Sequence, residues 1–206
     1  MILTLGTAAP RKSFMIFKEV MDRILALAGL ILLLPLLAVF CLLIRLTSRG
    51  PVFFRQERVG KDGRSFHILK LRTMVADAER ATGPIWARDN DPRITPLGRF
   101  LRLSHLDEIP QLINVLAGNM SLVGPRPERP VFVQQFMQQI PNYAERLRVK
   151  PGITGLAQVY HSYDSTVRDV RKKLAYDLLY IKKMCMMTDF VIIFLTVRCL
   201  TGRGAK

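Results

Sequence analysis

The chain has 206 residues, enough for one domain with a hydrophobic core, and its 31 Lys and Arg residues against 16 Asp and Glu residues give a formal net charge of +15. Such an excess of positive charge predicts an anionic partner, which can be a nucleic acid, an anionic membrane surface or a phosphorylated substrate. Because half of the residues are hydrophobic and the mean hydropathy is +0.19, the composition disfavours a nucleic-acid-binding protein and favours a protein of the membrane surface.

Residues 1–20 form a basic N-terminal segment in front of a long apolar run. Residues 24–44 carry no charge and are numerous enough for a membrane-spanning helix. Pro35 lacks a backbone N–H and clashes with the preceding turn, which predicts a break in the helix. Basic residues flank both ends of the run, whereas a spanning helix carries them mainly on its cytoplasmic side. We therefore predict a re-entrant membrane helix over residues 21–47, with a kinked spanning helix as the alternative.

A β-hairpin is predicted after this helix. Residues 52–59 and 64–74 have the composition of strands, and the glycine-flanked turn at residues 60–63 joins them. Lys70 and Arg72 are two residues apart on the second predicted strand, so they share one of its faces. Paired cations of this kind can be plain solvated surface, or they can hold a phosphate group.

The adjacent acids Asp107 and Glu108 are predicted to lie at the start of a short helix. Apolar residues recur at helical spacing from residue 106 to residue 116. Pro110 fits only in the first turn of such a helix, where its missing N–H is not needed. Acids at this position can simply stabilise the helix, because its dipole favours negative charge there.

Two arginines are predicted to be near the acid pair. The Thr-Pro pair at residues 95–96 is a typical helix start, and the helix that follows carries Arg102 toward the acids. Arg126 lies between Pro125 and Pro127, which restrict the backbone on both sides. This segment can be a generic rigid turn or a proline-rich ligand, but a fixed backbone also suits an arginine that orients a phosphate.

Residues 158–160, which begin with Gln158, are predicted to be briefly extended.

The C-terminal part of the chain contains two predicted apolar surfaces. Residues 167–181 show a helical apolar stripe, and the other faces of this helix carry cations such as Lys173. This pattern suits a membrane surface or a solvated face. The apolar residues 190–197 are too few to span a membrane and predict an interfacial or docking element.

A carboxylate pair combined with several cations suits phosphoryl transfer. Mg²⁺ is commonly held by one or two carboxylates together with substrate phosphates, and arginines bind phosphate oxygens through two parallel hydrogen bonds. A carboxylate can also be the nucleophile and form an aspartyl phosphate. The sequence contains no Walker loop, dinucleotide-binding glycine motif or metal-binding histidine pair.

Taken together, these segments resemble the monotopic phosphoglycosyl transferases of the bacterial sugar transferase family. The resemblance covers the chain from about residue 18 to its end. Besides the proline-broken apolar run, it rests on residues 66–74, 91–99, 106–112, 119–128, 150–158 and 176–180. It implies the minimal catalytic form of the family, without the N-terminal multi-helix domain of larger members.

The resemblance also implies a role for each candidate site residue. Asp107 is expected to be the nucleophile, and Glu108, together with Asp107, is expected to bind Mg²⁺. Arg102 and Arg126 are expected to contact substrate phosphates. The full set of expected substrate-binding residues is Lys70, Arg72, Arg102, Pro125, Arg126, Pro127 and Gln158.

The implied activity is the transfer of a sugar-1-phosphate from a UDP-sugar to undecaprenyl phosphate, with release of UMP. This would be the first membrane step of glycoconjugate or exopolysaccharide assembly, at the cytoplasmic face of the bacterial inner membrane. The expected fold is α+β: the re-entrant helix, followed by a small cytoplasmic catalytic domain over residues 48–206 with a β-hairpin and short, amphipathic and interfacial helices.

Two other functions remain as alternatives at this point. A nucleic-acid-binding protein is permitted by the charge, but the apolar run opposes it and no recognition motif is present. A non-catalytic membrane scaffold would use the same cations to bind anionic lipid, which we also expect as a partner of the enzyme.

Overall fold

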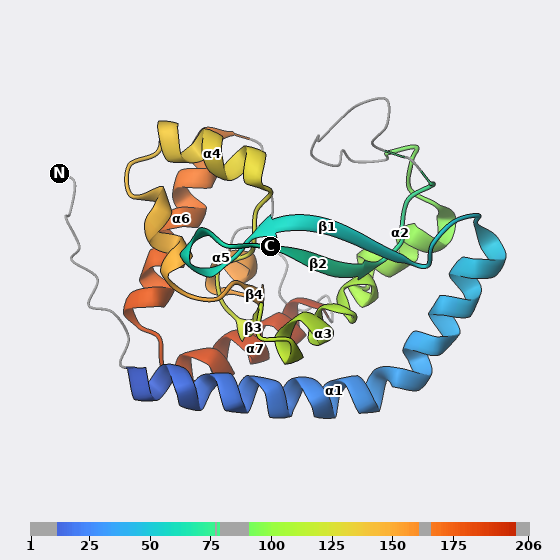
Figure 1. Cartoon of the computed structure of the whole chain (residues 1–206), viewed down its shortest axis with the longest axis horizontal. Helices are drawn as coiled ribbons and strands as arrows, with labels where there is room; N and C mark the ends of the chain where they lie inside the picture. The colour runs from blue at the N-terminus through green and yellow to red at the C-terminus, as the bar shows by residue number, and fades with distance from the viewer. Residues whose placement is uncertain (1–11, 77, 79–90, 161–165, 201–206) are drawn as a thin grey trace.

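The computed structural model describes residues 12–76, 78, 91–160 and 166–200, in which helices lie around two small two-stranded sheets (Figure 1). This arrangement confirms the predicted α+β class. The elements in chain order are α1 (Lys12–Thr47), β1 (Phe53–Val59), the 3₁₀ segment η1 (Lys61–Gly63), β2 (Ser65–Leu71), α2 (Pro96–Leu103), η2 (Leu106–Glu108), α3 (Gln111–Leu116), β3 (Ser121–Val123), α4 (Pro130–Gln139), η3 (Tyr143–Arg148), β4 (Gly152–Thr154), α5 (Leu156–Tyr160), α6 (Val167–Lys182) and α7 (Met186–Leu200).

Helix α1 begins at Lys12, earlier than the predicted residue 21, because the amphipathic residues before the apolar run are also helical. Residues 1–11 of the predicted basic segment lie outside the described residues. Pro35 lies inside the helix, and Figure 1 shows α1 bending in its C-terminal part, as an interior proline is expected to cause. Within the described residues, α1 is the one helix long and apolar enough to cross a membrane, judged by length and composition.

The predicted β-hairpin is confirmed, with a shorter second strand. β1 and β2 pair antiparallel, from Phe53 opposite Leu71 to Val59 opposite Ser65. The chain reverses through Asp62 and Gly63, both in the left-handed region with φ of 55° and 76°. Because β2 ends at Leu71, the strand alternation that was expected to continue to residue 74 stops there.

The second sheet holds the Pro-Arg-Pro segment against the chain after residue 150. β3 and β4 pair in parallel, with Ser121 opposite Gly152 and Val123 opposite Thr154. A Cβ atom on Gly152 would lie 2.1 Å from the backbone N of Gly124, so this close approach of two backbones requires glycine. The prediction that residues 158–160 are extended is wrong, because they belong to the short helix α5.

Helix α6 is a core helix: most of its predicted apolar stripe packs inside the protein, and not against a membrane surface as the sequence pattern suggested. Val170 and Leu174 pack with Phe136 and Tyr143 of the preceding segments. The helix begins with a capping box between Thr166 and Asp169. The prediction that Lys173 lies on an outer basic face is wrong, because its ammonium group binds the partly buried carboxylate of Glu128 at 2.6 Å.

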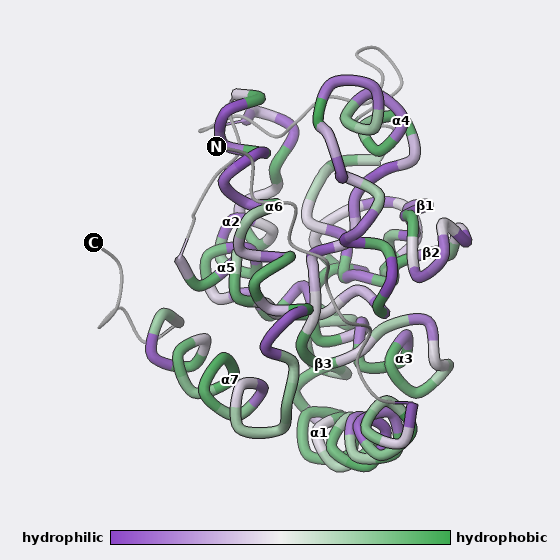
Figure 2. The backbone as a smooth tube through the Cα atoms, turned by 90° about the vertical axis from the view of Figure 1, so that its left-hand side faces the viewer, coloured by the Kyte–Doolittle hydropathy of each residue, from purple (hydrophilic) through white to green (hydrophobic). Residues whose placement is uncertain are grey.

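Large apolar side chains cover the outer faces of α1 and α7. Figure 2 shows both helices along the same lower edge of the molecule, with apolar residues predominating in each. Examples at least half exposed are Ile31, Leu32, Leu42 and Leu46 of α1, and Met187, Phe190, Phe194 and Val197 of α7. We call this surface the apolar lower face. Apolar exposure on this scale marks an interaction site.

Candidate active site

The acid pair lies in a short 3₁₀ segment in front of α3, and not in the first turn of that helix as predicted. His105 adopts the left-handed conformation, with φ of 55°, and turns the chain out of α2 into η2. Pro110 is then the N-cap of α3. In a 3₁₀ segment successive side chains point about 120° apart, so Asp107 and Glu108 face different surroundings.

Glu108 is held by two cations. The Lys70 ammonium group lies 2.6 Å from its Oε1 atom, and Nη2 of Arg126 lies 2.7 Å from the same atom. Burial by itself raises the pKa of Glu108, but the positive charges of Arg126 and Lys70 outweigh it and hold this pKa well below its usual range. Glu108 is therefore ionised at all physiological pH values and fixes the positions of both cations.

Asp107 has a very different environment. The residue is only 7% exposed, and within the described part of the chain its side chain forms no hydrogen bond or ion pair. Burial raises the pKa of Asp107, and the charge of Glu108 adds to this effect, while the charges of Lys70 and Arg102 oppose it. The carboxylate consequently keeps its lone pairs available for a nucleophilic attack or for a metal ion.

The two remaining predicted cations differ in their distance from the acids. Arg102 donates from Nε to the Thr73 hydroxyl at 2.8 Å. Burial lowers the pKa of Arg102, and the charge of Asp107 is the strongest effect that opposes this lowering. Arg72 instead donates to the carbonyl and hydroxyl of Ser48, at 2.9 and 2.7 Å, at the end of α1. The backbone N of Arg72 still donates to the Val52 carbonyl at 2.9 Å, but its side chain is taken up by Ser48 and not by the acid that Lys70 binds. No contact between described residues joins it to the acid pair.

The segment that carries Arg126 is fixed along its backbone. Its prolines cannot donate hydrogen bonds, and each carbonyl from Pro125 to Glu128 accepts one. The donors, in order, are Gly152 N at 3.0 Å, Arg146 Nη2 at 2.8 Å, Arg58 Nη1 at 2.9 Å and Val59 N at 2.9 Å. The predicted rigidity of this segment therefore comes from tertiary hydrogen bonds as well as from its prolines.

Gln158 supports the site indirectly. Its amide nitrogen donates to the Ile153 carbonyl at 2.8 Å, within the strand that pairs with β3. Its Oε1 atom is buried without a partner among the described residues. No contact in that part of the chain joins Gln158 to the acid pair, so its substrate-binding role stays a prediction.

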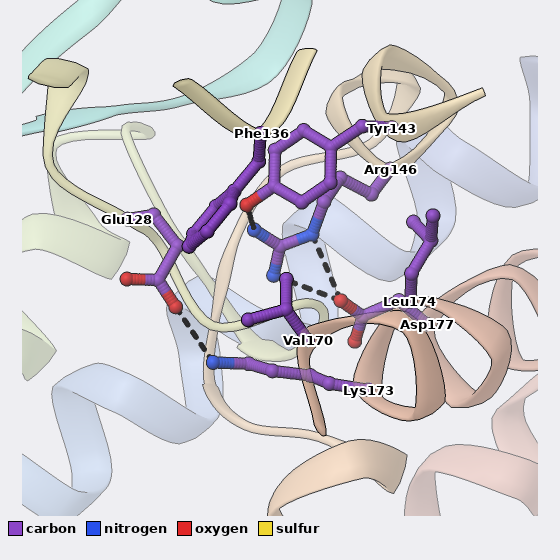
Figure 3. A pocket seen from close by; sticks show the side chains of 8 residues that line it. All are labelled: Glu128, Phe136, Tyr143, Arg146, Val170, Lys173, Leu174 and Asp177. Atoms are coloured by element: carbon purple, nitrogen blue, oxygen red, sulfur yellow. Dashed lines mark hydrogen bonds and ion pairs between the residues drawn. The ribbon is translucent and has the colours of Figure 1, made fainter. Parts of the chain in front are cut away.

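Arg146 and Asp177 were not among the predicted site residues, although Asp177 lies within residues 176–180, on which the resemblance partly rests. Both are buried together with Tyr143 (Figure 3), and Arg146 donates to the backbone carbonyl of Arg126. Apart from residues 176–180, the local pattern showed only an acid beside the apolar stripe of α6 and a cation in η3. Local patterns of that kind do not identify a buried pair.

The acid pair fits a Mg²⁺ ion only together with substrate oxygens. Among the described residues, no group of three His, Cys, Asp or Glu side chains is placed to hold a metal ion. Glu108 is already paired with two cations, whereas the Asp107 carboxylate has no partner there. One or two carboxylates completed by phosphate oxygens are the usual protein contribution to a Mg²⁺ site. The Mg²⁺ prediction thus stays compatible with the geometry, as a site shared with the substrate.

Comparisons with known proteins place the chain among polyprenyl-phosphate sugar transferases by sequence similarity. The chain is 44% identical over 203 residues to UDP-N-acetylgalactosamine-undecaprenyl-phosphate N-acetylgalactosaminephosphotransferase of Aeromonas hydrophila, covering 98% of this chain and 48% of that protein. It is 44% identical over 185 residues to UDP-glucose:undecaprenyl-phosphate glucose-1-phosphate transferase of Klebsiella pneumoniae, covering 89% of this chain and 40% of that protein.

A relative of similar length is the exopolysaccharide production protein PSS of Rhizobium leguminosarum bv. phaseoli. It is 38% identical over 195 residues, covering 92% of this chain and 98% of that protein. By contrast, the chain spans about half the length of the Aeromonas relative. The family model described as bacterial sugar transferase matches residues 13–203, and the chain therefore belongs to the bacterial sugar transferase family.

Proposed function

We propose that this protein transfers a sugar-1-phosphate from a UDP-sugar to undecaprenyl phosphate, releasing UMP and forming undecaprenyl-diphosphate-sugar. One observation carries the proposal: a buried, unpaired Asp107 lies next to a Glu108 that is clamped by two cations, in a chain of the bacterial sugar transferase family. The Aeromonas and Klebsiella relatives are named for a UDP-sugar and undecaprenyl phosphate, which supports the same substrate class here.

In the first half-reaction, a carboxylate oxygen of Asp107 attacks the β-phosphorus of the UDP-sugar. A bond forms between this oxygen and the phosphorus, and the bond from the phosphorus to the bridging oxygen breaks. UMP leaves with the bridging oxygen and its electron pair. The sugar phosphate then remains on Asp107 as a mixed anhydride.

In the second half-reaction, a phosphate oxygen of undecaprenyl phosphate attacks the same phosphorus atom. The bond to Asp107 breaks, and the carboxylate is regenerated for the next donor. One small site can therefore serve a soluble donor and a membrane-bound acceptor in turn.

The cations around the acid pair suit the charge of this reaction. Arg126 is 37% exposed at its side chain, so its guanidinium group can contact a diphosphate while it stays paired with Glu108. Lys70 and Arg102 place further positive charge beside Asp107. A bound Mg²⁺ ion would neutralise charge on the diphosphate and leaving group, and we assign Glu108 and Asp107 as its protein ligands.

We further propose that α1 enters the membrane and returns to the same face. Both of its ends bind one folded domain. Near the N-terminus, Lys18 pairs with Asp189 of α7, and Asp22 accepts a hydrogen bond from Ser121 of β3. At the other end, Ser48 accepts hydrogen bonds from Arg72. A helix whose ends lay on opposite sides of a bilayer could not make both sets of contacts.

The apolar lower face supports the same placement. It gives α1 and α7 a common surface for the hydrocarbon region, while the positive net charge favours anionic lipid headgroups. The resulting protein is monotopic, with residues 48–206 as the catalytic domain on the cytoplasmic face of the inner membrane. In this arrangement α7 is the interfacial helix, whereas α6 belongs to the core.

Cysteine labelling tests this topology. In a chain whose native cysteines are replaced by serine, we expect Lys12→Cys and Arg49→Cys both to resist a membrane-impermeant maleimide applied to intact cells. Both should react after the membrane is permeabilised. Labelling of residue 12 alone in intact cells would make α1 a spanning helix.

UMP release tests the activity itself. The purified protein should release UMP in the presence of Mg²⁺, undecaprenyl phosphate and the correct UDP-sugar. UDP-N-acetylgalactosamine and UDP-glucose are the first donors to try, because the relatives are named for these sugars. A non-catalytic membrane scaffold would release no UMP with any donor.

A further inference from the structure

Beneath the Arg126 segment lies a buried group of charged side chains that the proposed chemistry does not use. Figure 3 shows Arg146 between Tyr143 and Asp177, with the Glu128–Lys173 pair on the other side of a small cavity of about 10 Å³. Arg146 and Asp177 are only 3% and 2% exposed at their side chains. They come from different elements, η3 and α6.

Arg146 uses all three nitrogens of its guanidinium group. Nε and Nη2 contact Oδ2 of Asp177, at 2.9 and 2.8 Å, and Nη1 donates to the Tyr143 hydroxyl at 3.0 Å. Nη2 also donates to the backbone carbonyl of Arg126 at 2.8 Å. The carboxylate of Asp177 and the hydroxyl of Tyr143 thus orient the Arg146 guanidinium group toward the backbone carbonyl of Arg126. The side chain of Arg126 in turn reaches Glu108.

Stability alone gives a poor account of this pair. Removing two charges from water is expensive, and apolar residues of similar volume often stabilise a protein core as well or better. The hydrogen bond to the Arg126 carbonyl is a task that apolar residues cannot perform. It fixes the backbone from which the Arg126 side chain extends to Glu108, where its Nη2 atom lies 2.7 Å from Oε1.

We propose that Arg146, oriented by Asp177, is a positioning residue for Arg126. By fixing the Arg126 backbone, it sets where the guanidinium group of Arg126 meets the diphosphate of the donor. This inference rests on the proposed function, because the donor phosphates are what Arg126 is expected to contact. Arg146 itself is too deeply buried to touch the substrate.

The conservative variant Arg146→Lys separates positioning from folding. Lysine keeps the positive charge beside Asp177, but its single nitrogen cannot also reach Tyr143 and the Arg126 carbonyl. We expect UMP release to fall roughly 10- to 100-fold with a small change in melting temperature, because small displacements of substrate-binding groups have large effects on rate. The matched control is Arg148→Lys, in the same segment, whose exposed ion pair with Glu145 lies on the surface. It should keep wild-type turnover.

A charge-free double variant makes the test sharper. Arg146→Met combined with Asp177→Leu removes the buried pair as a whole, so no charge is left uncompensated. The double variant should therefore melt closer to the wild type than a variant that loses one partner alone. The Arg126 carbonyl still lacks its donor, so we expect the loss of UMP release to persist. Full recovery of turnover together with stability would overturn the inference, because it would reduce the pair to a structural role.

A double-mutant cycle with Arg126→Lys identifies the route of the effect. If Arg146 acts through Arg126, Arg146→Lys should lower turnover much less in the Arg126→Lys background than in the wild type. Fully additive losses would overturn the inference. The proposed function is judged separately: absence of UMP release from the wild-type protein would count against that function, whereas an active wild type with active, stable variants counts only against positioning.

Discussion

Replacement of Asp107 by asparagine is expected to abolish UMP release without lowering the stability of the protein. Burial raises the pKa of this carboxyl group in the folded state, despite the opposing charge of Lys70. A carboxyl group whose pKa is higher in the folded protein than in the unfolded chain favours folding when it is protonated, at pH values below its unfolded pKa. This stability is lost as the pH rises through its pKa in the folded protein. At pH 7 the Asp107 charge therefore destabilises the fold, and asparagine removes it while keeping the shape.

Melting temperatures and UMP release together measure this effect. At pH 7 the Asp107→Asn protein should melt at the same temperature as the wild type or higher. The difference should shrink as the pH falls toward the pKa of Asp107, where the wild-type carboxyl group becomes neutral. A marked loss of stability at pH 7 would instead assign Asp107 a structural role.

The neighbouring substitution Glu108→Gln is expected to have the opposite effect on stability. It leaves the partly buried Lys70 ammonium group and the Arg126 guanidinium group without their common carboxylate. Removing one partner of a buried ion pair costs about 3 kcal/mol. The lowered pKa of Glu108 gives a stabilising contribution that is present above the unfolded pKa and lost only as the pH falls through the folded value.

We expect Glu108→Gln to weaken both half-reactions and the dependence of the rate on Mg²⁺. Chemical denaturation and a Mg²⁺ titration of UMP release measure the two effects. Glu145→Gln is the matched control, because Glu145 is 41% exposed at its side chain and its pair with Arg148 should contribute only about 0–1 kcal/mol. Wild-type stability and Mg²⁺ dependence in Glu108→Gln would show that Glu108 neither holds the cations nor contributes to the metal site.

Local sequence patterns were sufficient for the elements whose stability is local. The hairpin follows from strand composition around a glycine turn, and the helix start at Thr95 follows from its side chain, which accepts a hydrogen bond from Gly98 N at 2.9 Å. The stripe of α6 became the buried face because helical periodicity directly specifies which side packs. The pairing of Lys70 with the acid pair also agrees with the expected site.

The remaining features depend on contacts between distant parts of the chain. His105 turns the chain into η2 in a left-handed conformation, which cannot be predicted from a residue other than glycine. The acids were therefore predicted at the start of an α-helix and lie in a 3₁₀ segment. Arg72 binds Ser48, a partner 24 residues away at the end of α1 that no local pattern specifies. Asp177 and Arg146 are separated by 31 residues, and neither has a local pattern that distinguishes a buried charge from a surface charge.

The central claim is that Asp107 carries the sugar phosphate, and the mass of the protein tests it most directly. The protein is incubated with its UDP-sugar and Mg²⁺ in the absence of undecaprenyl phosphate, and then digested. We predict a mass increase of one sugar phosphate on the peptide that contains Asp107, its loss on addition of undecaprenyl phosphate, and its absence in Asp107→Asn. UMP release that requires both substrates at once, with no adduct on that peptide, would contradict the covalent mechanism.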